Sequence, residues 1–358
     1  MPGRDFDRRI SSPEPHAVAL LGEIDGMRGE FKAASRMSAL SEAAMRRSAL
    51  VASAAASTRI EGSRLSDREV GEILAGLSAV PSSDRDFQEA RGYLETLGNV
   101  FSGYDRITLR ESAVRSLHAS LLKYSDKDAG HMGRYKKVEN AVGPVAADGK
   151  MAKALIKMTP ARLAGNETTE LVEWANAALE GGGFHPLLVI ANFVVELLKI
   201  HPFEDGNGRL SRVLTNLLLL RAGYGFVRYV SHERAVERRK EEYYLALRAS
   251  QETFGTGREN VAPWLNFFLS CLRGQAKAAV AAVGPARKTD SLSPKRAQVL
   301  GYLSTVREAG PNEISKATGV VLPTVRQSLG VLVEEGLAKM FGKGRATRYS
   351  ATGGEGTK

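Results

Sequence analysis

The apolar residues of this chain recur mostly every three or four positions, which is the spacing of amphipathic helices. Near the N-terminus, Leu20, Ile24 and Phe31 share one helical face. Six further segments either repeat this spacing or, in the first case, are rich in the strong helix former alanine. They span residues 44–56, 169–179, 187–200, 210–221, 233–250 and 262–282. The pattern therefore predicts a mainly α-helical protein.

Two capping boxes predict where shorter helices begin. Ser66 pairs with Glu69, and Thr108 pairs with Glu111, each just before an apolar helical run. In such a box the first and fourth side chains each accept a hydrogen bond from the other residue's backbone N–H. We therefore expect helices to begin directly after Ser66 and near Thr108.

The helical pattern weakens between residues 133 and 160. Val138, Val142 and Val145 are spaced around the turn-forming pair Gly143-Pro144. Valines separated by such residues are typical of hairpins. We expect a small β-hairpin flap in this region.

The last part of the chain is predicted to be a separate small module. Residues 284–293 (GPARKTDSLS) have the composition of a linker. Three short helices are predicted to follow, beginning near Pro294, Glu313 and Pro323, and residues 337–350 alternate like a hairpin. This order of elements is the outline of a winged helix-turn-helix domain.

Composition excludes several classes of protein. Of 358 residues, 43% are hydrophobic and 25% are charged, as in ordinary globular proteins of two or three domains. The longest apolar stretch, residues 187–200, is too short for a membrane span. The charged N-terminus has no apolar signal core, and the single cysteine, Cys271, cannot form an intrachain disulfide. We expect a cytoplasmic protein without a membrane partner.

The net charge is +10, and the excess is uneven. Residues 285–358 carry twelve Lys or Arg against six Asp or Glu. A basic module of this kind fits a polyanionic partner, but it equally fits an ordinary basic surface that aids solubility.

The sequence HPFEDGNGRLSR, which begins at His201, carries the strongest chemical signal. Gly206 and Gly208 have no Cβ, so backbone N–H groups can converge there at the start of a helix and bind an anion. Arg209 and Arg212 lie three positions apart and can reach the same anion. The plain alternative is a glycine-rich turn with a core histidine and solvated arginines.

Two further residues complete this inventory. Asp205 beside a phosphate site indicates Mg²⁺, a hard cation that prefers oxygen ligands. His201 has the unperturbed pKa that suits a base near neutral pH. The residues therefore indicate a Mg²⁺–nucleotide held by its phosphates next to a base.

This segment resembles the HPFxDGNGRxxR signature of Fic-domain proteins, and every fixed position matches. The resemblance implies the Fido fold and the transfer of AMP from ATP to a Ser, Thr or Tyr hydroxyl of a protein substrate. It implies that His201 is the catalytic base and that Asp205 holds Mg²⁺. It also implies nucleotide binding by the rest of the signature, namely Asp205, Gly206, Asn207, Gly208, Arg209 and Arg212.

A second segment, Ser57-Thr58-Arg59-Ile60-Glu61-Gly62, resembles the family's inhibitory motif (S/T)xxxE(G/N). The resemblance implies the class with an N-terminal inhibitory helix. In it, Ser57 and Glu61 lie on one side of the helix, and Glu61 pairs with Arg212 and deprives the γ-phosphate of a partner. Without the first motif, a solvated helix end closed by Gly62 would be the simpler interpretation.

The resemblance extends over about residues 42–275. It includes Gly133-Arg134-Tyr135, followed by Lys136 or Lys137 where relatives often have Arg. It implies a target-binding flap at residues 154–160, with Ile156 and Lys157 near the nucleotide. It also places Tyr243 and Tyr244 near the adenine, although both could instead be core residues of a helix. Relatives often dimerise, so a homodimer is a further expectation.

Two rival functions remain open. Some relatives with the inhibitory Glu use it to orient water and remove AMP from a modified protein. A different class of function is a DNA-binding regulator, in which the third helix and the wing of the C-terminal module contact DNA. Its candidate contacts are Thr324, Arg326, Gln327, Lys343, Arg345 and Arg348.

The other histidines show no metal-binding spacing, so His118, His131, His185 and His232 are expected to be core or surface residues.

The sequence predicts the following division into domains. They are a flexible tail at 1–15, an N-terminal helical region with the inhibitory helix at 16–107, a Fic catalytic core at 108–283, a linker at 284–293, a winged-helix domain at 294–352 and a tail at 353–358.

Overall fold

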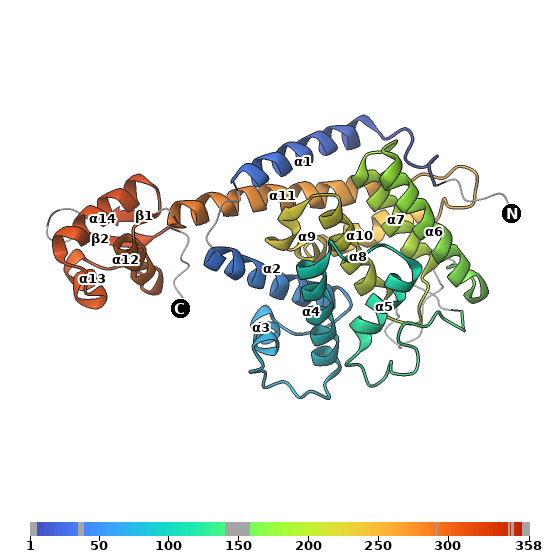
Figure 1. The fold of residues 1–358 in the computed structure, drawn as a ribbon, viewed down its shortest axis with the longest axis horizontal. Helices are drawn as coiled ribbons and strands as arrows, with labels where there is room; N and C mark the ends of the chain where they lie inside the picture. Colours follow the sequence, from blue (N-terminus) through green and yellow to red (C-terminus); the bar gives the residue numbers. More distant parts are fainter. Residues whose placement is uncertain are drawn as a thin grey trace. The chain divides into compact units, whose positions relative to one another are not determined.

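The structure is a computed structural model that describes residues 6–34, 39–139, 158–290, 292–342, 344 and 347–352. It divides into two units, Met1–Glu30 with Ala44–Ala279 and Phe31–Ala43 with Val280–Lys358. The described residues are mainly helical, as the sequence predicts (Figure 1). The predicted flap falls largely in residues 140–157, which lie outside the described residues.

The larger unit contains twelve described helices, three of which, α1, α2 and α11, continue past its boundary. They are α1 (Pro15–Ala34), α2 (Ala39–Ile60), α3 (Asp67–Ala75), α4 (Arg85–Gly103), α5 (Glu111–Leu122), α6 (Ala161–Gly181), α7 (Pro186–Ile200), α8 (Asn207–Arg221), the 3₁₀ helix η1 (Gly225–Arg228), α9 (His232–Glu237), α10 (Lys240–Gln251) and α11 (Ala262–Asp290).

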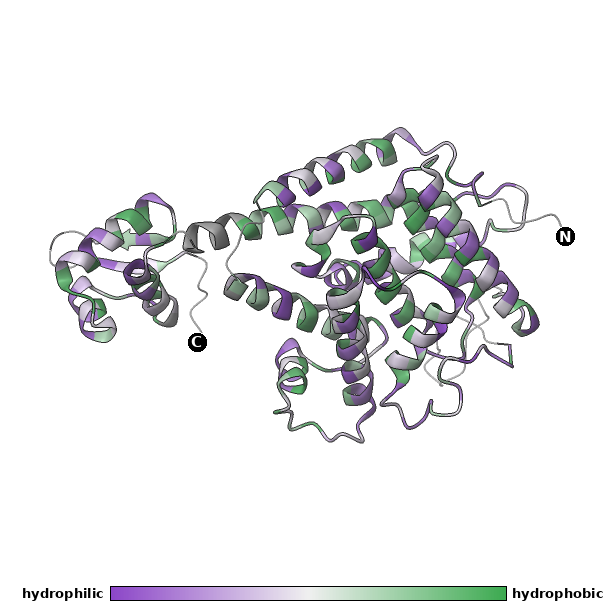
Figure 2. Cartoon of the chain, viewed as in Figure 1, coloured by the Kyte–Doolittle hydropathy of each residue, from purple (hydrophilic) through white to green (hydrophobic). Residues whose placement is uncertain are grey.

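The centre of this unit is formed by α7 and α8. Residues 187–198 of α7 and 209–220 of α8 are all buried. Helix α7 is apolar on nearly every side, and such a helix is stable only inside a protein, whereas α8 is buried although it carries polar residues such as Arg212 and Asn216. Here α7 packs against α6, α8 and α10, and α8 packs against α4 and α5. Figure 2 shows the apolar colour of α7. No helix in the described part of the chain is long and apolar enough to cross a membrane.

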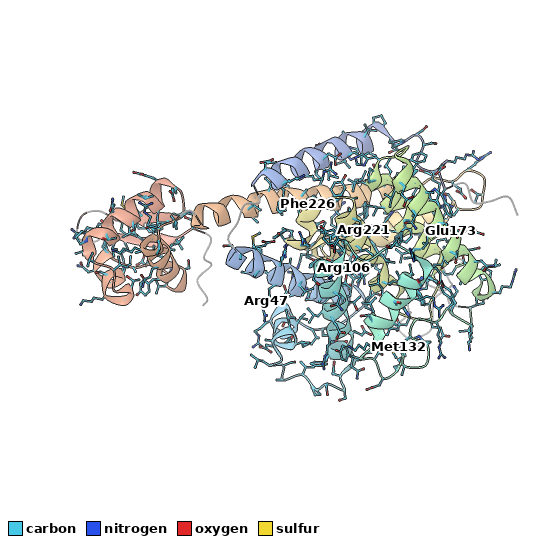
Figure 3. The ribbon with its side chains drawn as sticks, viewed as in Figure 1. Arg47, Arg106, Met132, Glu173, Arg221 and Phe226 are labelled. Carbon is cyan, nitrogen blue, oxygen red and sulfur yellow. The ribbon has the colours of Figure 1, made fainter. Side chains whose placement is uncertain are left out.

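This packing fixes the loop that joins the two helices, residues 201–206. Side chains fill the space between the ribbons (Figure 3), and Phe226 of η1 is one of the fully buried residues. Because both flanking helices are held on several sides, the loop begins and ends at fixed points. The sequence segment with the strongest chemical signal therefore sits on a rigid support.

The N-terminal segment was predicted to be a flexible tail at 1–15, but part of it is packed within the larger unit. Phe6 and Ile10 are buried, with 4% and 1% of their surface exposed. Arg9 forms ion pairs with Glu196 of α7 and with Glu259, which is 2.5 Å away. The prediction was wrong for residues 6–14, because these partners lie about 190 and 250 positions along the chain and local composition gives no sign of them.

The two predicted capping boxes have different outcomes. Ser66 and Glu69 form the expected reciprocal hydrogen bonds at the start of α3. The second prediction was wrong, because α5 begins at Glu111 with Arg110 as its N-cap and no side-chain capping bond. The helix therefore begins two residues later than the Thr108 box requires.

The smaller unit contains α12 (Pro294–Thr305), α13 (Pro311–Thr318), α14 (Leu322–Glu334) and the antiparallel strands β1 (Ala338–Phe341) and β2 (Arg348–Ala351). The strands pair in the register Ala338 to Ala351 and Phe341 to Arg348. Val299, Ile314, Val325, Leu329 and Leu332 belong to its buried core. The order of elements is the predicted one, and the identification as a winged helix stays a prediction. Helix α11 runs to Asp290, so most of the predicted linker is helical.

Candidate active site

His201 ends α7 in a left-handed backbone conformation, with φ of +49°. Its N–H donates to Leu197 O at 2.9 Å, and its ring Nδ1 lies 3.3 Å from Leu198 O. A carbonyl oxygen can only accept, so Nδ1 carries the proton and Nε2 is the basic nitrogen. The end of the helix thus fixes both the position and the tautomer of the imidazole.

The surroundings of His201 keep it neutral. Burial is the main cause that lowers the pKa of His201 to about 4, and the Lys136 ammonium acts in the same direction, while the Leu198 carbonyl and the carboxylates of Glu61 and Asp205 oppose this shift. Lys136 is itself buried and donates to Ile200 O, the last carbonyl of α7. At neutral pH the imidazole is therefore ready to accept a proton.

Asn207 holds the loop in shape. Its side-chain Oδ1 accepts from Phe203 N–H at 3.0 Å, and its Nδ2 donates to Phe203 O at 2.8 Å. Both ends of the amide are thus used within the loop, and the role of Asn207 in nucleotide binding, implied by the resemblance, stays a prediction.

Helix α8 begins directly after this loop. Gly206 is its N-cap with φ of +76°, a conformation that a residue with a Cβ adopts only with strain. The first N–H groups of a helix have no partner within the helix and carry the positive end of its dipole. The segment from Gly206 to Gly208 therefore presents an anion-binding end toward the cavity described below.

Charged side chains surround Asp205. Its Oδ1 accepts from Gly206 N–H at 2.6 Å and from Arg209 at 3.3 Å, while Oδ2 lies 3.6 Å from Arg85 and 4.0 Å from Lys127. Burial opposes ionisation of Asp205, but these cations and the N–H group outweigh it and lower its pKa. The carboxylate is therefore ionised at neutral pH.

The two arginines of the signature take different partners. Arg209 is 2% exposed and also pairs with Glu89 of α4 at 3.2 Å. Arg212 instead contacts α2: its Nε donates to Ser57 Oγ at 2.8 Å, and one terminal nitrogen donates to Ser57 O at 3.1 Å and to Glu61 Oε1 at 2.7 Å. The predicted pairing of Glu61 with Arg212 is thus present.

The Glu61 carboxylate and α8 are in very close contact. Burial opposes ionisation of Glu61, yet the guanidinium of Arg212 outweighs it and lowers the pKa of Glu61. A Cβ added to Gly208 would overlap Glu61 Oε1 and lie 3.3 Å from Arg212. Only glycine at 208 admits the carboxylate at this position.

A cavity of about 240 Å³ joins these groups. It brings together the sequence-predicted residues Glu61, His201, Asp205, Gly206, Asn207, Gly208, Arg209, Tyr243 and Tyr244. Residues that the sequence analysis missed also line it, among them Glu204, Met158, Leu198, Leu247 and Gln251. Leu247 and Gln251 lie four and eight positions after Tyr243, so helical spacing could have found them.

The two tyrosines that line the cavity differ in how far they are buried. Tyr243 is 4% exposed and packs edge-on against Trp264, whereas Tyr244 is 41% exposed. Tyr243 is therefore both a core residue and a cavity residue. The predicted flap contacts Ile156 and Lys157 lie outside the described residues.

The candidate DNA contacts lie on the smaller unit. Arg326 and Gln327 on α14 are exposed and Thr324 is half-buried, while Lys343 and Arg345 lie outside the described residues. Arg348 pairs with Glu308 at 3.0 Å and Glu313 at 3.2 Å. These ion pairs compete with any phosphate for Arg348.

Comparison with known proteins identifies the central domain. Residues 108–219 match the family model Fic/DOC family. The chain is 29% identical over 165 residues to Protein adenylyltransferase Fic of Drosophila grimshawi, covering 46% of this chain and 28% of that protein. It is 27% identical over 222 residues to the protein of the same name from Aedes aegypti, covering 60% and 38%. The chain thus spans well under half the length of these relatives.

Solved structures resemble the whole fold. A Fic family protein from Desulfovibrio desulfuricans G20 has a TM-score of 0.63 at 23% identity, covering 97% of this chain and 98% of that one. Fic-1 from C. elegans (residues 134–508) has a TM-score of 0.58 at 19% identity, covering 74% and 72%. Residues 108–219 therefore match the Fic/DOC family, and the chain shares the Fido fold of solved Fic family proteins.

Proposed function

We propose that this protein is an adenylyltransferase that moves AMP from ATP to a Ser, Thr or Tyr hydroxyl of a protein, and that Glu61 restrains it. The observation that supports this most directly is the shared cavity. It is lined by a neutral imidazole, by the N-terminal end of α8 and by a carboxylate bound to the second arginine of the signature. Relatives named Protein adenylyltransferase Fic support the same chemistry at the level of the family.

The proposed reaction is a direct displacement at the α-phosphorus of ATP. The target hydroxyl oxygen forms a bond to this phosphorus, and the bond to the bridging oxygen of pyrophosphate breaks. The hydroxyl proton passes to Nε2 of His201. The backbone N–H groups at the start of α8 bind the phosphates and stabilise the charge that develops, so catalysis rests on positioning and electrostatics.

The residues fit a magnesium ion that arrives with the nucleotide. Within the described residues there is no group of three or more His, Cys, Asp or Glu that could hold a metal alone. Mg²⁺ in nucleotide sites commonly takes one or two carboxylates and completes its shell with phosphate oxygens and water. Asp205 Oδ2, which lies 3.6 Å from Arg85 and 4.0 Å from Lys127, would supply that carboxylate. When bound, the ion would neutralise phosphate charge.

Restraint by Glu61 follows from competition for Arg212. The guanidinium is 4% exposed and uses Nε and one terminal nitrogen on Ser57 and Glu61. A triphosphate that needs Arg212 must displace the Glu61 carboxylate. The cavity of about 240 Å³ is also smaller than the range of about 300–1,000 Å³ usual for ligand pockets. Both features favour a site that binds ATP poorly until Glu61 moves.

The proposal is tested with ATP labelled on the α-phosphate, incubated with and without cell lysate. Glu61→Gly is expected to raise protein labelling by about tenfold or more, the size of a typical coupling between sites. The double variant Glu61→Gly with His201→Ala should lose labelling yet still bind ATP. Persistent labelling in the double variant would remove His201 from the mechanism, and absence of label in every variant would reject the transferase.

A second candidate, removal of AMP from a modified protein, is supported by the position of Glu61. Its side chain is 35% exposed and lines the same cavity as His201, so it could orient a water molecule. Protein labelled by the Glu61→Gly variant serves as substrate for the wild type. Release of labelled AMP by wild type but not by Glu61→Gly would favour the hydrolase, and stable label would exclude it.

A further inference from the structure

His118 of α5 lies directly beneath the loop of the candidate active site. Its side chain is fully buried, although it is a titratable residue and lies 83 positions before His201. Its Nε2 is 3.0 Å from the backbone oxygen of Asp205, and its Nδ1 accepts from the N–H of Gly133 at 2.9 Å. The ring thus connects two separate backbone segments.

One neutral tautomer satisfies both contacts. Gly133 N–H can only donate, so Nδ1 must be unprotonated. Asp205 O can only accept, so Nε2 must carry the proton. No apolar side chain could replace this bridge, because the buried Gly133 N–H and the part-buried Asp205 carbonyl would then lose this partner.

The ring also touches the loop through its face. It stacks on Phe203 with ring centroids 3.8 Å apart and planes 8° apart. A Cβ on Gly206 would lie 3.4 Å from Nε2, so the left-handed turn passes close over the ring edge. His118 therefore contacts the loop at three successive points: Phe203, Asp205 and Gly206.

The second backbone segment is itself anchored. Gly133 has φ of +65°, and its carbonyl accepts from Arg115 Nε at 2.7 Å. Three residues later, Lys136 N–H donates to Pro202 O at 2.9 Å. The segment 133–136 therefore lies along the loop and is tied to it through His118 at one end and Lys136 at the other.

We propose that His118 is a positioning residue that sets the backbone of Asp205, and hence the carboxylate that receives Mg²⁺–ATP, through its bond to the Asp205 carbonyl. This inference rests on the proposed function. His118 does not face the cavity and exchanges no proton in the reaction. Its effect on the site passes through the loop alone.

Two nearly isosteric substitutions of His118 test separately the contact made by each ring nitrogen. In His118→Gln the amide nitrogen can still donate to Asp205 O, whereas in His118→Asn the amide oxygen can still accept from Gly133 N–H but does not reach Asp205. Both are made in the Glu61→Gly background, so that ATP binding is not masked by Glu61. Affinity for ATP is measured by calorimetry with and without Mg²⁺, together with the melting temperature.

The Gln variant is expected to keep the Mg²⁺-dependent gain in ATP affinity within about threefold, and the Asn variant to lose about tenfold or more, because small displacements of a positioned group are costly. Melting temperatures of the two variants should fall by similar amounts. Equal Mg²⁺ dependence in both variants, whatever their melting temperatures, would overturn the proposal and leave His118 a purely structural residue.

A matched control and a ligand-free measurement complete the test. His131→Gln changes a neighbouring histidine whose ring pairs with Asp128 at 3.0 Å, and it should leave the Mg²⁺ dependence unchanged. Amide hydrogen exchange of residues 203–208 should be faster in His118→Asn than in His118→Gln, and this requires no nucleotide. If ATP does not bind to any variant while exchange follows this order, the proposed function fails and the loop-positioning role stands; equal exchange rates reject that role independently.

Discussion

Among single residues, unusual backbone conformations gather in the loop that joins α7 and α8. His201 is the only non-glycine residue with positive φ in the described part of the chain, and Gly206 adopts the left-handed region five residues later. Such conformations cost on the order of 1–3 kcal/mol when a side chain is present and persist only where neighbours impose them. Here Asn207 and His118 impose the loop shape, so the strain at His201 is fixed together with the direction of its ring.

The low pKa of His201 predicts the pH profile of transfer. Because only the neutral imidazole accepts a proton, the rate of Glu61→Gly should stay nearly constant from pH 8 to about 5. It should fall tenfold per unit only below the pKa of about 4. Initial rates at saturating ATP and Mg²⁺ measure this. A midpoint near 6.5, the value of an exposed histidine, would show that His201 is solvated during turnover.

Among the helices, α2 is held at its C-terminal end from two sides. One side carries the bonds of Ser57 and Glu61 to Arg212. On the other side, Arg59 pairs with Glu237 of α9 at 2.5 Å and with Asp67 of α3 at 3.1 Å. The second set of ion pairs lies outside the cavity and is partly exposed, so it can be changed without touching the reacting groups.

Arg59→Ala is therefore expected to raise labelling from ATP by a few-fold, less than Glu61→Gly does, because α2 loses one of its two anchors. Arg47→Ala is the matched control, since Arg47 is an exposed arginine on the same helix (Figure 3). Labelling rates of the two variants at equal protein concentration make the comparison. No increase for Arg59→Ala, or an equal increase for Arg47→Ala, would show that this ion pair does not hold the inhibitory position.

At the scale of the whole molecule, the sequence predicts most of the local features, with the Thr108 cap as an exception, and it fails on distant contacts. The loop at 201–206, the start of α8, the helix that ends just before Glu61 and the Ser66–Glu69 cap each depend on residues a few positions apart, and the sequence predicts each of them. The pairing of Glu61 with Arg212 was expected only through the family resemblance. The anchoring of Arg9 and the bridge made by His118 depend on tertiary packing, which no spacing rule contains.

Buried histidines make the stability of the larger unit depend on pH. Burial lowers the pKa of both His118 and His201 to about 4, and it also lowers the pKa of fully buried His232. The unfolded chain takes up these protons near pH 6.5 and the folded chain does not, so stability falls as pH drops from about 6.5 toward 4. The free energy of unfolding in urea should decrease by on the order of 2–4 kcal/mol between pH 7 and 5. A constant value over this range would contradict the neutral, buried state of these rings.

Because Gly208 has no side chain, the Glu61 carboxylate can lie against the start of α8. Glu61 occupies the space that any larger residue at 208 would fill, directly over the first turn of α8. The Glu61 carboxylate thus blocks part of the nucleotide site by its volume, and by its charge it competes with phosphate for Arg212. Removing the charge alone, as in Glu61→Gln, leaves the obstacle in place, so that variant should label proteins at a rate between those of the wild type and Glu61→Gly.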